Sequence, residues 1–162
     1  MAQETIAVTL LKQVQAIVGP DHATDDAARC DLATSDVFER SEGGPALMVV
    51  SPRSTGETAA VVRLLGKHCV PVIARGAGLS YTGSFAAQRP SAVIDTSRLT
   101  GIEVNAADCY AIVGAGASWA DVAAALKPIR MAPTQISPIS GASIFVAFVT
   151  FCQNSGGPWS AA

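Results

Sequence analysis

The chain carries little charge and few aromatic side chains. Of its 162 residues, 15% are charged and 6% are aromatic, and the net charge at pH 7 is −2. The Lys and Arg residues are scattered singly, so no basic patch exists to follow a nucleic-acid backbone. The shortage of aromatic side chains also argues against a platform on which bases stack. These two shortages predict that nucleic acid is not a partner.

Closely spaced cysteines are lacking as well. The four cysteines, Cys30, Cys69, Cys109 and Cys152, form no C-x-x-C pair, so neither a zinc site nor a thioredoxin-like motif is indicated. The N-terminus shows no positive region followed by an apolar core, so no signal peptide is predicted. The apolar run 144–151 is too short to span a bilayer. We therefore expect a cytoplasmic protein with reduced thiols.

Sequence signatures of hydrolytic and metal-dependent catalysis are also missing. No serine lies in a G-x-S-x-G context, no H-E-x-x-H occurs, and neither His22 nor His68 has a recognisable acid or nucleophile partner. The sequence thus predicts no metal site and identifies no catalytic residue.

What the chain does contain is apolar sequence, 49% of all residues, in a length that suits about one domain. Apolar residues at helical spacing predict a helix from about residue 4 to residue 18, ended by Gly19-Pro20. Residues 21–45 are polar and rich in turn formers, which predicts an irregular crossing segment. We expect residues 1–45 to form one region and residues 46–162 a partial cofactor-binding domain.

Strands and helices are predicted to alternate after residue 45. The predicted strands are residues 46–50, 70–74, 91–95, 102–105 and 110–114. Thr55 is the predicted N-cap of a helix between the first two strands, and Ser118 that of a helix reaching Leu126. The last two strands alternate and are expected to pair antiparallel. This order predicts an α+β (mixed α/β) fold.

The most informative segment is Arg75-Gly-Ala-Gly-Leu-Ser-Tyr-Thr-Gly83, which follows a predicted strand. Glycine permits positive φ and removes the Cβ that would keep a ligand away. Consecutive backbone N–H groups in such a loop form an anion-binding concavity. Ser80 and Thr82 add hydroxyl donors, and Arg75 adds positive charge. The loop therefore predicts a phosphate or pyrophosphate site, the alternative being a simple turn.

Three other loops of small residues need an interpretation. Residues 137–143 and 153–157 are compatible with phosphate binding, although each alone is most often only a loop. The segment Gly114-Ala-Gly-Ala-Ser-Trp119 lies between a predicted strand and a predicted helix. Trp119 fills its third small position, and no acidic residue follows about twenty positions later, as a ribose-binding fingerprint needs. A tight turn is therefore favoured there over a Rossmann motif.

Taken together, these motifs resemble the FAD-binding domain of the vanillyl-alcohol oxidase / p-cresol methylhydroxylase flavoprotein superfamily, in its glycolate and D-lactate oxidase or dehydrogenase form. The segments that carry the resemblance are 52–57, 71–78, 93–99 and 113–122. The resemblance implies the N-terminal part of a p-cresol methylhydroxylase-type FAD-binding domain, in which two α/β subdomains clasp FAD. It also implies that the C-terminal half of that domain and the substrate domain are absent.

The resemblance further implies which residues contact the cofactor. In the first loop they are Arg75, Gly76, Ala77, Gly78, Leu79, Ser80, Thr82 and Gly83, and downstream they are Pro138, Ser140, Gly141, Ser143, Asn154, Ser155 and Gly156. Some family members attach the flavin through a histidine in the first loop. Leu79 occupies the corresponding position here, so the resemblance implies FAD bound non-covalently.

The implied reaction is oxidation of a small hydroxy acid or alcohol by hydride transfer to flavin. The small-molecule substrate would bind the missing domain, so the chain alone is expected to be inactive. The family usually carries a Gly-Gly pair where this chain has Ala147-Phe148. That departure motivates an alternative, a non-catalytic fragment or accessory module that folds with a protein partner. A third reading is a reductase or molybdenum-hydroxylase flavin subunit of the same fold.

Overall fold

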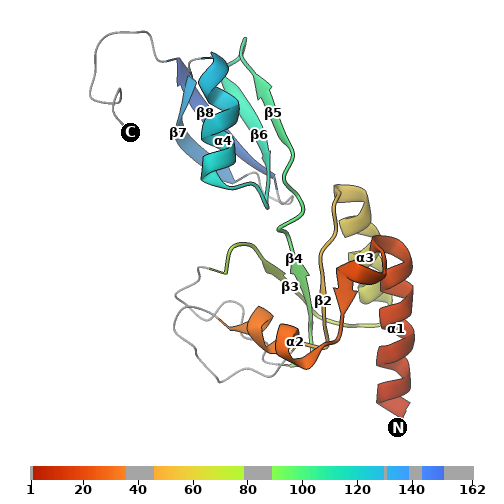
Figure 1. Cartoon of the computed structure of the whole chain (residues 1–162). Helices are drawn as coiled ribbons and strands as arrows, with labels where there is room; N and C mark the ends of the chain where they lie inside the picture. Colours follow the sequence, from red (N-terminus) through yellow and green to blue (C-terminus); the bar gives the residue numbers. More distant parts are fainter. Residues whose placement is uncertain (1, 36–45, 79–88, 130, 139–143, 152–162) are drawn as a thin grey trace. The chain divides into compact units, whose positions relative to one another are not determined.

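A computed structural model of the chain describes residues 2–35, 46–78, 89–129, 131–138 and 144–151. The chain divides into two compact units, Met1–Leu99 and Thr100–Ala162 (Figure 1). The division predicted from the sequence, 1–45 and 46–162, concerns the limits of the cofactor-binding domain and stays a prediction.

In its described residues, the first unit contains a four-stranded sheet and three α-helices. Its elements are α1 (Ala2–Val18), the 3-10 turn η1 (Pro20–His22), β1 (Ala23–Thr24), α2 (Ala27–Thr34), β2 (Met48–Val50), α3 (Thr55–Lys67), β3 (Val72–Arg75) and β4 (Ala92–Asp95). The strand order is β1-β2-β4-β3. Strands β2, β4 and β3 run parallel, and β1 pairs antiparallel with β2.

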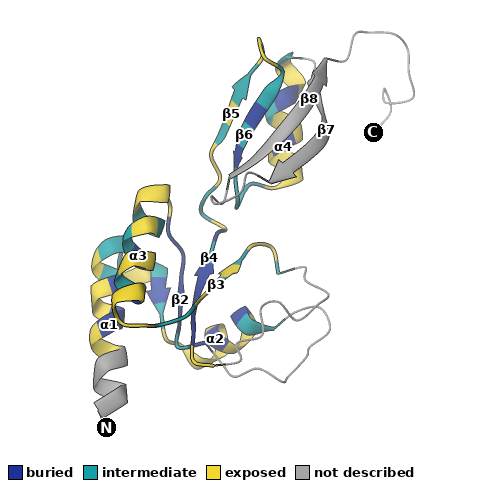
Figure 2. Ribbon diagram, turned by 180° about the vertical axis from the view of Figure 1, so that it is seen from behind, coloured by how far each residue is buried: buried dark blue, intermediate teal, exposed yellow. Residues whose placement is uncertain are grey.

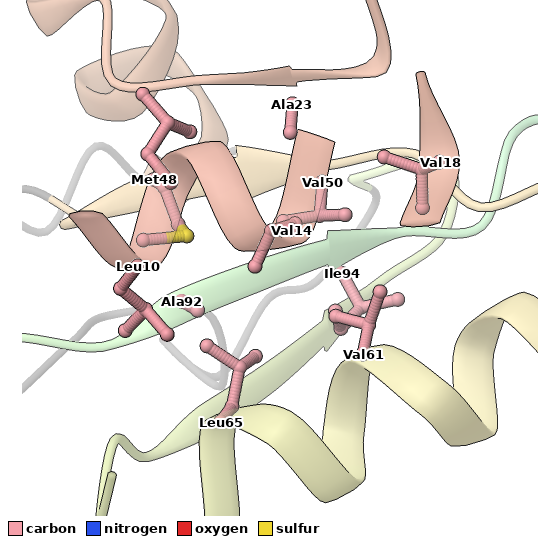
Figure 3. Close-up of a cluster of buried hydrophobic side chains, with 11 residues drawn as sticks. Leu10, Val14, Val18, Ala23, Met48, Val50, Val61, Leu65, Ala92 and Ile94 are labelled. Atoms are coloured by element: carbon pink, nitrogen blue, oxygen red, sulfur yellow. The ribbon is translucent and has the colours of Figure 1, made fainter. Parts of the chain in front are cut away.

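Helices cover both faces of this sheet. On one face, α1 and α3 pack against side chains of β2 and β4, including Met48, Val50 and Ile94 (Figure 3). On the other face, Cys30 and Ala33 of α2 form a second cluster with strand residues. Buried residues therefore follow one another along β2 and β4 (Figure 2), as parallel strands between helices require.

The local signals place most helix ends correctly. The helix α1 ends at Val18, and Gly19 takes a φ of +97°, which glycine adopts without strain. The predicted N-cap Thr55 is wrong by one residue. The cap of α3 is Ser54, whose Oγ accepts a hydrogen bond from the Glu57 backbone N–H at 3.1 Å. Ser and Thr are both favoured N-cap residues, so the sequence alone does not distinguish Ser54 from Thr55.

The prediction of an irregular segment over residues 21–45 is wrong in part. Helix α2 occupies Ala27–Thr34, and Asp26 caps it by accepting from the Arg29 backbone N–H at 3.0 Å. The helix is eight residues long and buries only Cys30 and Ala33, so its apolar pattern is weak. Residues 36–45 of the predicted segment lie outside the described residues.

The second unit contains an antiparallel sheet with the order β5-β6-β8-β7. Its elements are β5 (Ile102–Asn105), β6 (Tyr110–Gly114), α4 (Trp119–Leu126), the 3-10 turn η2 (Lys127–Ile129), β7 (Met131–Pro138) and β8 (Ile144–Phe151). The predicted antiparallel pair 102–105 and 110–114 is confirmed, with Ile102 opposite Val113. Val122 and Leu126 of α4 pack on Ala111 and Val113 of β6.

Candidate cofactor-binding site

The three parallel strands of the first unit end side by side. Val50 of β2 pairs with Ile94 of β4, which also pairs with Ala74 of β3. The residues after these positions, 51–52, 75–78 and 95–98, therefore share one end of the sheet, which we call the carboxyl edge. In open sheets with parallel strands, ligands bind outside this end. The glycine loop predicted from the sequence starts here.

At this edge, position 78 favours glycine because the residue there needs a backbone without a Cβ. Its φ is +77°, a conformation that residues with a Cβ rarely adopt. A Cβ built on Gly78 would lie 2.8 Å from Cζ of Arg75 and closer still to one guanidinium nitrogen. The guanidinium thus lies directly against the Gly78 backbone. A loop with exposed backbone and an adjacent positive charge fits a group that carries two phosphates.

The start of the loop is fixed to β4. The Arg75 carbonyl accepts a hydrogen bond from the Thr96 backbone N–H at 2.9 Å and another from Thr96 Oγ1 at 3.3 Å. Thr96 is only 5% exposed, so these bonds are shielded from water. The last peptide group before the glycines is therefore held in one orientation.

Polar side chains also brace the carboxyl edge between β2 and β4. Ser51 Oγ donates to Asp95 Oδ2 at 3.3 Å, and the Ser97 backbone N–H donates to Asp95 Oδ1 at 2.9 Å. Arg98 Nη1 donates to the Ser51 carbonyl at 2.8 Å. Sequence reasoning did not find Ser51 or Thr96, since their partners lie 44, 47 and 21 residues away along the chain.

Helix α3 begins at the same edge, and an ion pair closes its first turn. The pKa of the Glu57 carboxyl is lowered, first because the Arg53 backbone N–H donates to it at 2.9 Å. Arg53 Nε also donates to Glu57, at 2.8 Å, and the nearby charge of Arg98 acts in the same direction. Both oxygens of the Glu57 carboxylate thus accept hydrogen bonds from Arg53 within this turn.

In the second unit, the turn from β6 to α4 agrees with the tight-turn interpretation. The Ala117 backbone N–H donates to the Gly114 carbonyl at 3.0 Å, and Ser118 caps α4 as predicted. Ser118 Oγ donates to Asp121 Oδ2 at 2.6 Å and accepts from the Asp121 backbone N–H. This side-chain bond is the main reason why the pKa of Asp121 is lowered.

The structure brings four of the predicted cofactor residues together: Arg75, Gly76, Ala77 and Gly78 share the carboxyl edge. Pro138 is the last residue of β7, in the second unit. The other predicted residues lie outside the described part of the chain: Leu79, Ser80, Thr82, Gly83, Ser140, Gly141, Ser143, Asn154, Ser155 and Gly156.

Neither a metal site nor a membrane-spanning helix is present among the described residues. No group of three His, Cys, Asp or Glu side chains among them is placed to hold a metal ion. None of the helices in these ranges has the length and hydropathy to cross a membrane. An open hollow of about 500 Å³ lies over the β5–β6 hairpin, where Glu103, Asn105 and Tyr110 line it. Its lining includes none of the predicted cofactor residues.

A parallel α/β unit with a glycine loop at its carboxyl edge, followed in the chain by an antiparallel sheet, defines a cofactor-binding domain of the p-cresol methylhydroxylase type. A family model described as "FAD binding domain" matches residues 46–158. The chain belongs to this FAD-binding domain family, and FAD is the cofactor of that domain.

Individual relatives agree with this assignment. The chain is 31% identical over 91 residues to a D-lactate dehydrogenase from Archaeoglobus fulgidus, a match that covers 56% of this chain and 20% of that protein. An alkyldihydroxyacetonephosphate synthase has a TM-score of 0.69 at 19% identity, with 76% of this chain and 25% of that one covered. A substrate-bound p-cresol methylhydroxylase has a TM-score of 0.65 at 15% identity, covering 78% and 26%.

These matches bear on the predictions made from the sequence. The chain spans about a fifth to a quarter of the length of these relatives. The fold class and the superfamily predicted from the sequence are confirmed. The alternative of a non-catalytic accessory module is not favoured by a family match that covers most of the chain.

Proposed function

We propose that this chain forms the FAD-binding part of a flavin-dependent oxidoreductase and holds the FAD pyrophosphate at the carboxyl edge of its first unit. The observation that carries the proposal is Gly78, whose positive φ disfavours any residue with a Cβ and whose backbone lies against the Arg75 guanidinium, which a Cβ would displace. Arg75 would neutralise phosphate charge, and the N–H groups of residues 76–78 would donate to phosphate oxygens.

The proposed reaction is oxidation of a small hydroxy acid or alcohol. Support comes from the name of the curated relative, a D-lactate dehydrogenase, which shares 31% identity over 91 residues. When bound, the flavin supplies the hydride acceptor, a chemistry that no protein side chain provides. The share of this chain is to bind and orient the cofactor.

We further propose that FAD binds non-covalently. Leu79, at the position where some related proteins carry a histidine, has no nucleophilic atom to form a bond to the flavin. Acid precipitation of the FAD-loaded chain checks this point directly. All of the flavin is expected in the supernatant, and yellow protein in the pellet would contradict non-covalent binding.

We also propose that the protein is located in the cytoplasm, where cysteine thiols stay reduced.

The experiment that tests the function is a titration of the chain with FAD, followed by flavin fluorescence and by melting temperature. Saturable binding with a rise in melting temperature is expected, because a ligand of the native state stabilises it. Gly78→Ala is expected to weaken binding at least about tenfold, since Ala strains the backbone and displaces Arg75. Gly66→Ala is the matched control, because a Cβ at Gly66 has no neighbour within 4 Å.

Two results would contradict the proposal. One is a chain that is folded, by its melting transition, and yet takes up no FAD. The other is a Gly78→Ala variant that binds FAD as tightly as the Gly66→Ala control.

A further inference from the structure

The Arg75 carbonyl has an unusual double connection to the end of the neighbouring strand. Thr96 donates to this one oxygen from its backbone nitrogen at 2.9 Å and from its hydroxyl at 3.3 Å. The backbone bond continues the parallel pairing of β3 with β4, in which Arg75 lies opposite Asp95. The hydroxyl bond is additional, and the Thr96 side chain that makes it is buried.

This connection determines where the next N–H group points. The Arg75 carbonyl and the Gly76 N–H belong to one planar trans peptide group, so they point in opposite directions. Since the carbonyl faces Thr96 on β4, the Gly76 N–H faces away from β4. Among the described strands, β3 is the outer one on that side. The first donor of the glycine loop is therefore directed toward the open side of the sheet.

We propose that Thr96 is a positioning residue of the FAD site. Its hydroxyl fixes the Arg75–Gly76 peptide group, so that the Gly76 N–H is oriented in advance toward the pyrophosphate. Thr96 acts through Arg75 and needs no contact with the cofactor. The inference rests on the proposed function, because it assumes that the pyrophosphate binds at this loop.

The carboxyl edge supports this role by keeping Thr96 itself in place. The preceding residue, Asp95, accepts hydrogen bonds from Ser51 and from the Ser97 backbone N–H. Arg98 binds the Ser51 carbonyl. The Thr96 hydroxyl therefore lies at a strand end that other hydrogen bonds already hold in place. Little conformational entropy is lost at this position when FAD binds.

Three variants separate positioning from simple stability. Thr96→Val keeps the β-branched shape and removes the hydroxyl, whereas Thr96→Ser keeps the hydroxyl. Thr34→Val is the matched control, because Thr34 Oγ1 also donates to a backbone carbonyl, that of Cys30 at 3.2 Å, within α2. For each variant, FAD affinity, melting temperature without FAD and the amide nitrogen–proton NMR signal of Gly76 are measured.

Thr96→Val is expected to weaken FAD binding about threefold to tenfold, the value of one hydrogen bond. It should also shift the Gly76 amide signal. Thr96→Ser should restore both, and Thr34→Val should change neither, even where its melting temperature falls as far as that of Thr96→Val. Unchanged FAD affinity in Thr96→Val, or an unmoved Gly76 signal, would overturn the positioning role.

The two readouts keep this inference distinct from the proposed function. If the wild-type chain takes up no FAD, the proposed function fails. The NMR comparison then still shows whether Thr96 orients the Gly76 peptide group, and an unmoved signal overturns that orientation by itself. If the wild-type chain binds FAD and Thr96→Val binds it equally well, only the positioning role fails.

Discussion

The two units of the chain bury their strands in different ways. In the first unit, β2 is buried at all three positions and β4 at its first three, since helices pack on both faces of the parallel sheet. In the second unit, β6 alternates between buried and half-buried residues, and α4 packs against its buried positions, Ala111 and Val113. A sheet covered on both faces produces continuous apolar strands, and one covered on a single face produces alternation.

The same difference explains why the proposed cofactor site lies in the first unit. Parallel strands all end at the same edge, so loops that are far apart in the sequence meet there. In the antiparallel unit, successive strands end at opposite edges, and the side-chain hydrogen bonds of its described residues are local, as in the Ser118–Asp121 capping box. We therefore expect substitutions in the first unit to affect both stability and FAD affinity, and substitutions in the second unit to affect stability alone.

The largest expected effect comes from opening the two cores. Leu65 of α3 and Leu126 of α4 are both 0% exposed. Leu65→Ala and Leu126→Ala should each lower the free energy of unfolding by about 2 to 5 kcal/mol. If the units are separate cores, hydrogen exchange should speed up only in the unit that carries the substitution. Equal loss of protection in both units would show one shared core instead.

Removing the helix caps should have a smaller effect, roughly 1 kcal/mol for each. Ser54→Ala removes the cap of α3 and Ser118→Ala that of α4. Because α3 begins at the carboxyl edge, Ser54→Ala should also reduce FAD affinity in the titration. Ser118→Ala should lower the melting temperature to a similar extent and serves as its control. An equal loss of FAD affinity in both variants would remove the proposed difference between the units.

A stabilising change of about 0.5 kcal/mol is expected from Gly66→Ala. Gly66 lies in the last turn of α3, is exposed and has no positive φ, so Ala reduces the entropy of the unfolded chain without strain. Chemical denaturation measures the gain. FAD affinity should stay unchanged, and a lower stability would indicate that this turn of α3 is not helical.

The smallest expected effect is on the loss of folding stability at low pH. The folded-state pKa values of Glu57 and Asp121 are both lowered by hydrogen bonds. A carboxyl of this kind contributes stability above its unfolded pKa, near pH 4 for these residue types, and loses it as the pH falls through the folded value. Glu57→Gln and Asp121→Asn should therefore flatten the loss of stability below about pH 5. An unchanged slope in both would contradict these assignments.

Local signals in the sequence predicted the parts of the fold that depend on neighbouring residues. Each of these signals spans only a few residues. They are the alternation in 102–105 and 110–114, the cap at Ser118 and the glycines Gly76 and Gly78. Helix α2 was missed because a short helix with two buried side chains has little periodicity.

The rest of the site could not be predicted because its bonds join distant parts of the chain. Ser51, Thr96 and Arg98 each have ordinary sequence surroundings, and their roles appear only when β2, β3 and β4 lie together. Conversely, most residues of the predicted phosphate loops lie outside the described residues, so their roles stay predictions.

The strand order has a consequence for how this chain folds. Strand β4 is the last of the three parallel strands to leave the ribosome, and yet it lies between the other two. The strands made earlier, β2 and β3, have no pairing with each other and must wait for a later segment to insert between them. Such non-local assembly is intrinsically slow. The glycine loop gains its support only at that final insertion, so a nascent chain should acquire flavin affinity late and abruptly.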